Sequence, residues 1–181
     1  MGYDVHAFLV PPGAMDAFIG SSAPAPLEAL RTRTDVREGV KDAVRELSLG
    51  RISTEAHRAA DVLYAAEWLC EHFGTRARES IRLNPTGLRA TRELELLLRT
   101  KLPVALPTAV DFPSVGYMPI AVIDLRLAKA AHLSATSVDA WHDLPRWLVW
   151  GVDGMDAERL TYLGWIRDAG EARRDLWFFH H

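Results

Sequence analysis

Three histidines near the two ends of the chain are the first residues whose types suggest chemistry. His6 lies in an alternating apolar segment near the N-terminus, and His180 and His181 are the last two residues of a similar segment at the C-terminus. If both segments pair as strands, the imidazoles could converge beside Asp4, which is about the donor set that holds a divalent metal. The alternative is that they only pack at the end of a sheet. Because no strong ligand motif is present, we expect no metal and no other cofactor, and we keep His6 and His180 as candidate binding residues.

A second group of polar side chains has helical spacing. His57 and Asp61 are four residues apart, and Glu71 and His72 follow in the same predicted helix. Residues at this spacing share a helix face, so they could orient an imidazole or simply form a solvated face. Cys70 belongs to the apolar stripe of this helix, and we expect it to be a buried, unreactive thiol.

Residues 107–118 are the preferred candidate for a binding site. Three prolines between positions 103 and 113 preclude a helix, so residues 102–118 are predicted to form a long loop. Asp111, Phe112 and Tyr117 give this loop acidic, apolar and hydrogen-bonding groups. They could line a pocket or meet a partner, or they could only cap the core.

Tryptophan is concentrated in the C-terminal part of the chain, where five of the six lie between positions 141 and 177. Trp165 fits the apolar stripe of a predicted helix, and Trp177 fits the terminal strand, so both are expected in the core. Trp141 and Trp147 lie in a segment that no periodicity explains. Since tryptophan is enriched at binding hot spots, we predict that these two contribute to a binding surface.

Charge and composition exclude several classes of function. The net charge is −3 and the pI is about 6.2, whereas nucleic-acid binding usually needs a strongly basic face. Residues 75–101 hold seven basic and three acidic side chains, net +4, between acidic flanks that can pair with them. No stretch approaches the ~20 apolar residues of a membrane span, and the first residues lack a leader pattern. With a single cysteine, these features predict a cytoplasmic protein that binds neither nucleic acid nor membrane.

The hydrophobic periodicity predicts a single α+β domain over residues 1–181. Strands are expected at 2–10 and 174–181, where apolar residues alternate. Helices are expected at about 14–19, at 21–49 as one or two helices, and at 54–73, 86–101 and 155–170, with a linker at 75–85. Residues 119–133 have both helical and strand character. The fold is therefore mostly helical, with a small antiparallel sheet that contains the N- and C-terminal strands.

Several short motifs occur in a characteristic order along the chain. They are Met1-Gly2-Tyr3, Gly20-Ser21, Tyr64-Ala65-Ala66-Glu67-Trp68-Leu69-Cys70, Asp111-Phe112-Pro113, Gly116-Tyr117, Gly164-Trp165 and the terminal Asp175-Leu176-Trp177-Phe178-Phe179-His180. This order resembles an uncharacterised family of small actinobacterial cytosolic proteins, a domain of unknown function whose members end in an aromatic pair followed by His. A more distant resemblance, through the first strand, is to the YfbM-like family of bacterial proteins. These resemblances imply a fold and a bacterial source, and no particular reaction.

Two classes of function follow from the sequence. The first is a non-enzymatic binding protein with a protein partner, for example an immunity-like protein, because no catalytic motif is present and the segment around Trp141 and Trp147 is rich in unexplained aromatic residues. The second is a small-molecule-binding enzyme, for example a hydrolase, that uses the 107–118 loop with a histidine of the sheet. Proximity of Asp111 or Tyr117 to a histidine would favour the enzyme, and an exposed apolar surface with tryptophan would favour the binding protein.

Overall fold

A computed structural model describes residues 3–53, 55–77, 80–83, 101–107, 113–125 and 156–181. A short helix also covers residues 120–125. The named elements, in chain order, are β1 (Tyr3–Val10), α1 (Ala14–Phe18), α2 (Pro24–Arg31), α3 (Glu38–Ser48), α4 (Ala56–Phe73), β2 (Thr75–Arg76), β3 (Ile81–Leu83), β4 (Ser114–Met118), α7 (Asp156–Glu171) and β5 (Asp175–His180).

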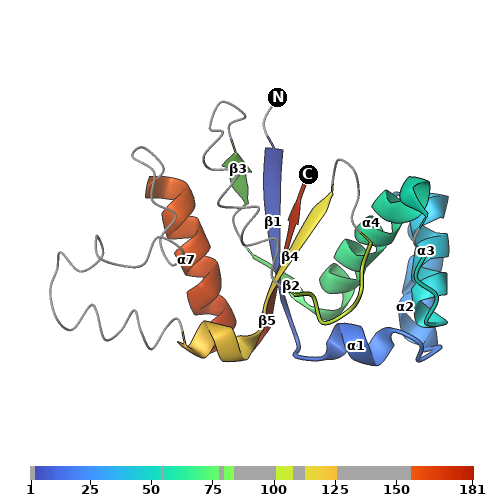
Figure 1. Cartoon of the computed structure of the whole chain (residues 1–181), viewed down its shortest axis with the longest axis horizontal. Coiled ribbons are helices and arrows are strands. Elements are labelled where there is room, and N and C mark those ends of the chain that lie inside the picture. Colours follow the sequence, from blue (N-terminus) through green and yellow to red (C-terminus); the bar gives the residue numbers. More distant parts are fainter. Residues whose placement is uncertain (1–2, 54, 78–79, 84–100, 108–112, 126–155) are drawn as a thin grey trace, which may run out of the picture.

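An antiparallel sheet forms the centre of the molecule (Figure 1). Its strand order is β2-β1-β5-β4. Strand β3 lies on the same side of β1 as β2: β3 pairs with the N-terminal part of β1, and β2 pairs with the C-terminal part. The two terminal strands are direct neighbours, with His6 opposite Phe179 and Val5 opposite His180. The predicted α+β class and the predicted pairing of the terminal strands are therefore confirmed.

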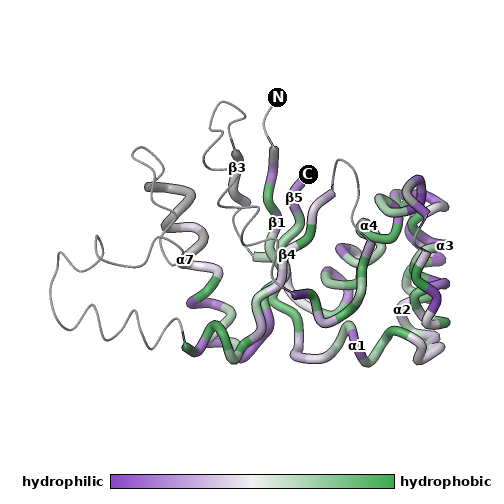
Figure 2. The backbone as a smooth tube through the Cα atoms, viewed as in Figure 1, coloured by the Kyte–Doolittle hydropathy of each residue, from purple (hydrophilic) through white to green (hydrophobic). Residues whose placement is uncertain are grey.

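Helices cover both faces of this sheet, because successive strand residues point to opposite sides. Helices α1 to α4 lie on one side and α7 lies on the other (Figure 1). Phe8, Trp177 and Phe179 pack towards α1–α4, whereas Leu176 and Phe178 pack towards α7 with Trp165, Ile166 and Ala169. Hydrophobic residues accordingly recur along the central strands (Figure 2). The predicted core positions of Trp165 and Trp177 are confirmed.

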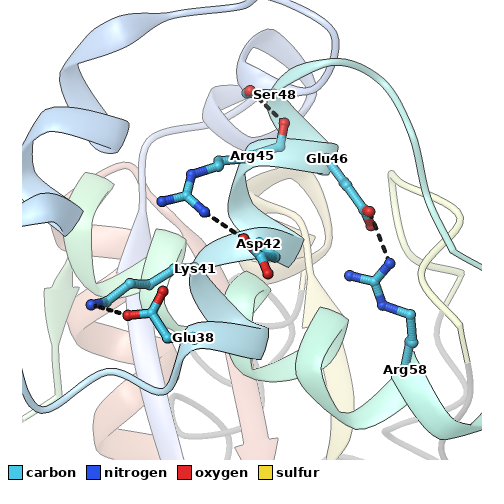
Figure 3. Close-up of polar contacts among 7 residues, drawn as sticks. All are labelled: Glu38, Lys41, Asp42, Arg45, Glu46, Ser48 and Arg58. Carbon is cyan, nitrogen blue, oxygen red and sulfur yellow. Dashed lines mark hydrogen bonds and ion pairs between the residues drawn. The ribbon is translucent and has the colours of Figure 1, made fainter.

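The predicted helical region at 21–49 consists of two helices, α2 and α3. Helix α3 buries one apolar stripe, made of Val40, Ala43, Val44 and Leu47. Its outer face carries ion pairs between Glu38 and Lys41, between Asp42 and Arg45, and between Glu46 and Arg58 of α4 (Figure 3). Pairs of this exposed kind contribute little to stability, so the buried stripe is what holds α3 against α4.

Two predictions for the middle of the chain were wrong. The expected linker at 75–85 contains β2 and β3, which pair with the two halves of β1. The expected loop at 102–118 ends as β4, which pairs with β5 and places Val115 and Tyr117 in the core. Prolines 113 and 119 lie just outside this strand and bound it, so the proline density does not oppose it. Residues 86–100 of the predicted helix at 86–101 lie outside the described residues.

No helix in the described ranges has the length and apolarity that a membrane span requires.

Gly74 ends α4 at a point where the chain passes very close to β1. A Cβ atom at this position would clash with the backbone oxygens of Leu9 and Cys70, because it would lie closer to both than van der Waals contact allows. We expect Gly74→Ala to lower the free energy of unfolding by about 2 kcal/mol, because backbone atoms must shift to admit the methyl group. Urea unfolding measures this change.

Gly164 of α7 is the matched control for this substitution. A Cβ atom there would meet no atom of the rest of the described structure within 4 Å, its own helix backbone and chain neighbours aside, so Gly164→Ala should gain about 0.5–1 kcal/mol from helix propensity. Equal stability of the two variants would contradict the close approach of α4 and β1 at Gly74.

Candidate functional site

Three polar side chains from distant parts of the chain meet on the sheet face that is covered by α4. His6 belongs to β1, Glu67 to α4, and His181 directly follows β5. The backbone N–H of His181 donates to the carbonyl oxygen of Asp4 at 2.9 Å, which continues the β1–β5 pairing by one residue. Since His6 lies opposite Phe179, His181 is its diagonal neighbour on the same face.

Both imidazoles approach the same carboxylate oxygen. Nδ1 of His6 is 3.2 Å from Oε1 of Glu67, and Nε2 of His181 is 3.0 Å from it. The two ring centroids are 4.9 Å apart, with the planes inclined at 48°. One nitrogen from each ring and one carboxylate oxygen therefore lie within 4.8 Å of one another.

The three side chains are partly buried. The exposed fractions are 24% for His6, 15% for Glu67 and 23% for His181. Burial by itself would raise the pKa of Glu67, but the hydrogen bonds from His181 and His6, together with their charges, outweigh burial and lower that pKa. Glu67 is consequently an ionised carboxylate at neutral pH, available as an acceptor or as a metal ligand.

Aromatic and charged side chains flank this cluster on one side. The ring of Tyr64, one turn before Glu67 in α4, stacks on His181 with centroids 5.6 Å apart and planes 20° from parallel. The guanidinium of Arg37 lies 5.0 Å from the centre of the Tyr64 ring and pairs with Asp61 at 3.3 Å. Tyr64 therefore restricts the orientation of the His181 ring.

Two imidazole nitrogens and one carboxylate oxygen form a donor set that suits a divalent transition metal. A tetrahedral ion with bonds of about 2.0–2.2 Å separates its ligand atoms by about 3.3–3.6 Å. The two nitrogen–oxygen separations of 3.2 and 3.0 Å are a few tenths of an ångström shorter, and all three donor atoms lie within 4.8 Å of one another. Small side-chain movements would convert these hydrogen bonds into coordination, with the ion in place of the shared protons.

Comparison with known protein families adds one finding. The model of a domain of unknown function, DUF7691, matches residues 1–181. The chain belongs to this family. No curated protein and no solved structure is significantly similar to it.

The structure of this DUF7691 protein separates the histidines that the sequence grouped. His6 and His181 meet at Glu67, whereas His180 points to the α7 face, as adjacent strand residues must, and is buried. Asp4 contributes its backbone carbonyl, and the group of potential ligands consists of His6, Glu67 and His181. The binding role predicted for His180 stays a prediction.

Tyr117, the binding candidate from the predicted loop, lies in β4 and is buried against Trp177. Its hydroxyl donates to Oδ2 of Asp175 at 2.8 Å, and Oδ1 accepts the backbone N–H of Ile120 at 2.9 Å. Burial and the hydrogen bond to Asp175 raise the pKa of Tyr117. Tyr117 thus joins β4 to β5 by a buried contact. Four further candidates lie outside the described residues: Asp111, Phe112, Trp141 and Trp147.

The polar group predicted along the helix at 54–73 does not form one cluster. His57 is exposed near Glu55, and His72 stacks on Trp68. Cys70 is a buried thiol, as predicted, and burial followed by the nearby charge of Glu67 raises its pKa well above the ordinary value. It is therefore a protonated core residue.

Glu67 is the site residue that sequence reasoning missed. Its position in the sequence does carry a signal, because Leu63 and Cys70, four residues before it and three after it, are both fully buried. A carboxylate at this spacing lies on the inward face of the helix. A charged residue there needs a partner, and His6 and His181 are those partners.

The burial of His180 predicts a pH dependence of stability. Desolvation, followed by the charge of His181, lowers the pKa of His180 from its ordinary 6.5. Just below pH 6.5 the unfolded chain therefore binds more protons at this residue than the folded protein, so stability falls as the pH drops through 6.5. We expect His180→Phe to reduce this loss, as measured by urea unfolding across that range.

The exposed His57 provides the comparison for this measurement. His57→Gln should change the pH dependence less than His180→Phe does. An unchanged slope in His180→Phe would contradict the contribution assigned to His180.

Proposed function

We propose that this protein binds a divalent transition-metal ion, with zinc as the reference ion, through His6, Glu67 and His181. The observation that supports the proposal is the convergence of two imidazole nitrogens and one carboxylate oxygen, all within 4.8 Å, from β1, α4 and the end of β5. These residues are separated by 61 and 114 positions along the chain. Their proximity is therefore a product of the tertiary fold.

The donor atoms favour some ions over others. Imidazole nitrogen suits zinc, nickel, copper and iron, whereas calcium and magnesium prefer sites made of oxygen atoms. The carboxylate adds a negative charge that two neutral imidazoles lack. A site of this composition should bind zinc or cobalt strongly and magnesium weakly.

The proposal extends the first of the two sequence-based hypotheses, a non-enzymatic binding protein, by naming an ion as its ligand. A protein partner, an immunity-like role and a surface around Trp141 and Trp147 remain predictions from the sequence, as do the cytoplasmic location and the absence of nucleic-acid binding. The same is true of the alternative, a hydrolase-like enzyme with a site at 107–118. Actinobacterial origin and a distant likeness to the YfbM-like family are also predictions.

Equilibrium dialysis of the untagged, chelator-treated chain against zinc tests the proposal. We expect one zinc ion per chain, displaced by a large excess of cobalt and not by the same excess of magnesium. At a free zinc concentration about 100 times the dissociation constant, the melting temperature should rise by about 5–10 °C. Failure to retain zinc, or retention that magnesium abolishes, would contradict the proposal.

A further inference from the structure

The surroundings of the three side chains indicate what else a bound ion would hold. We infer that an ion at His6, Glu67 and His181 keeps a coordination position open to solvent and takes a small, free carboxylate anion there. This inference rests on the proposed function, because it concerns the same site.

The number of ligands is the first argument. Zinc takes four ligands, and sites with three protein ligands hold water or a substrate in the fourth position. The group formed in the described part of the chain supplies three ligand atoms. All three side chains retain exposed surface, between 15% and 24%. Solvent therefore reaches part of each of these three side chains.

Charge is the second argument. Two neutral imidazoles and one ionised carboxylate leave a divalent ion with a net charge of +1. An anion at the fourth position neutralises this charge in a partly desolvated site, where electrostatic attraction is stronger than in bulk water. The guanidinium of Arg37 is already paired with Asp61 and lies beyond the Tyr64 ring, so we assign the preference for an anion to the ion itself.

The Tyr64 ring is the third argument. It stacks on His181, carries the Arg37 guanidinium over its ring, and borders one side of the site. A carboxylate with a short hydrocarbon part would place its oxygen on the ion and its few carbon atoms beside Tyr64. A bulky carboxylate-bearing chain has less room, because Tyr64 and α4 border the site on that side.

The cobalt(II)-substituted protein provides the test, because its visible absorption reports the number and type of ligands. We expect acetate to change this spectrum saturably, with half-saturation below about 100 mM, and acetamide, which is uncharged, to leave it unchanged. A blocked tripeptide with one central glutamate distinguishes a free carboxylate from the side chain of a protein partner, and we expect it to bind more weakly than acetate.

The outcomes separate this inference from the proposed function. A cobalt spectrum that acetate does not change would overturn the inference and leave metal binding intact. Equal responses to acetate and acetamide would overturn the preference for an anion. Tighter binding of the tripeptide would overturn the free carboxylate as ligand. If cobalt does not bind at all, the proposed function itself fails.

Discussion

Replacing Glu67 with Gln is expected to lower the affinity for zinc at least about 100-fold. Glu67 supplies the charged ligand and contacts both imidazoles through one oxygen atom, at 3.0 and 3.2 Å. A neutral amide is a weaker ligand, and loss of its charge removes the attraction that holds the ion between two neutral rings. Because removal of residues that only support a ligand already costs about 10–100-fold, loss of the ligand itself should cost more. Competition with a chelator of known affinity measures the effect.

Glu71→Gln is the matched control, since Glu71 lies one turn further along α4 and is exposed. Its affinity for zinc should equal that of the unmodified chain. Urea unfolding of Glu67→Gln must show a cooperative transition, because loss of the two charge-assisted hydrogen bonds should cost only about 1–3 kcal/mol of stability. A folded Glu67→Gln variant with unchanged affinity would show that zinc binds elsewhere.

Substitution of a histidine ligand tests the same metal site independently of Glu67. His181→Gln removes one nitrogen ligand and should also lower zinc affinity at least about 100-fold. His57→Gln changes a histidine that is exposed on α4 and lies outside the group of potential ligands, and it should have no effect. Equal losses in the two variants would indicate non-specific binding of zinc to histidine.

The substitution with the largest expected effect on stability is Asp175→Ala, which should lower the free energy of unfolding by about 3 kcal/mol. Asp175 is 4% exposed, and its two oxygens accept hydrogen bonds from the Tyr117 hydroxyl and the Ile120 backbone N–H. Alanine removes the acceptor from the buried Tyr117 hydroxyl and from the partly buried Ile120 N–H, and a buried donor that loses its acceptor costs about 1–3 kcal/mol. Chemical denaturation measures the difference.

Two further variants separate the contributions of these hydrogen bonds. Tyr117→Phe removes one donor and leaves the bond to Ile120, so it should cost about 1 kcal/mol. Asp175→Asn keeps an acceptor for Ile120 and should lie between Tyr117→Phe and Asp175→Ala. Zinc affinity should be unchanged in all three, because Asp175 begins β5 whereas His181 follows its end. A cost below about 1 kcal/mol for Asp175→Ala would contradict the assigned role.

The sequence predicts the terminal strands and most helices well, because their patterns are local. Residues of β1 alternate between two cores, and the stripe of α3 repeats at three- and four-residue steps. The alternation predicted for residues 174–181 also places His180 and His181 on opposite faces of the sheet. Because His6 lies opposite Phe179, only His181 can share its face.

Strands β2, β3 and β4 could not be predicted in the same way. Strand β2 has two residues and β3 has three, which is too short for a pattern. Strand β4 lies between two prolines, and it forms by pairing with β5, which is almost sixty residues further along the chain. Their formation depends on the unpaired edges of β1 and β5, which only the assembled sheet provides.

The site was partly predictable for the same physical reason. Pairing of the two terminal strands predicts that His6 approaches a histidine at the C-terminus, and the structure brings His6 and His181 together. The third member, Glu67, depends on how α4 packs across the sheet. That packing depends on the buried residues of the core between α4, β1 and β5. No local sequence pattern predicts how they pack together.

Crystallography of the zinc-loaded protein, with anomalous diffraction at the zinc edge, tests the central claim most directly. We predict one anomalous peak about 2.0–2.2 Å from Nδ1 of His6, Nε2 of His181 and a carboxylate oxygen of Glu67. Data collected below the edge should lose this peak. A zinc-loaded crystal in which the three side chains retain their mutual hydrogen bonds, with no peak among them, would contradict the assignment of the metal site.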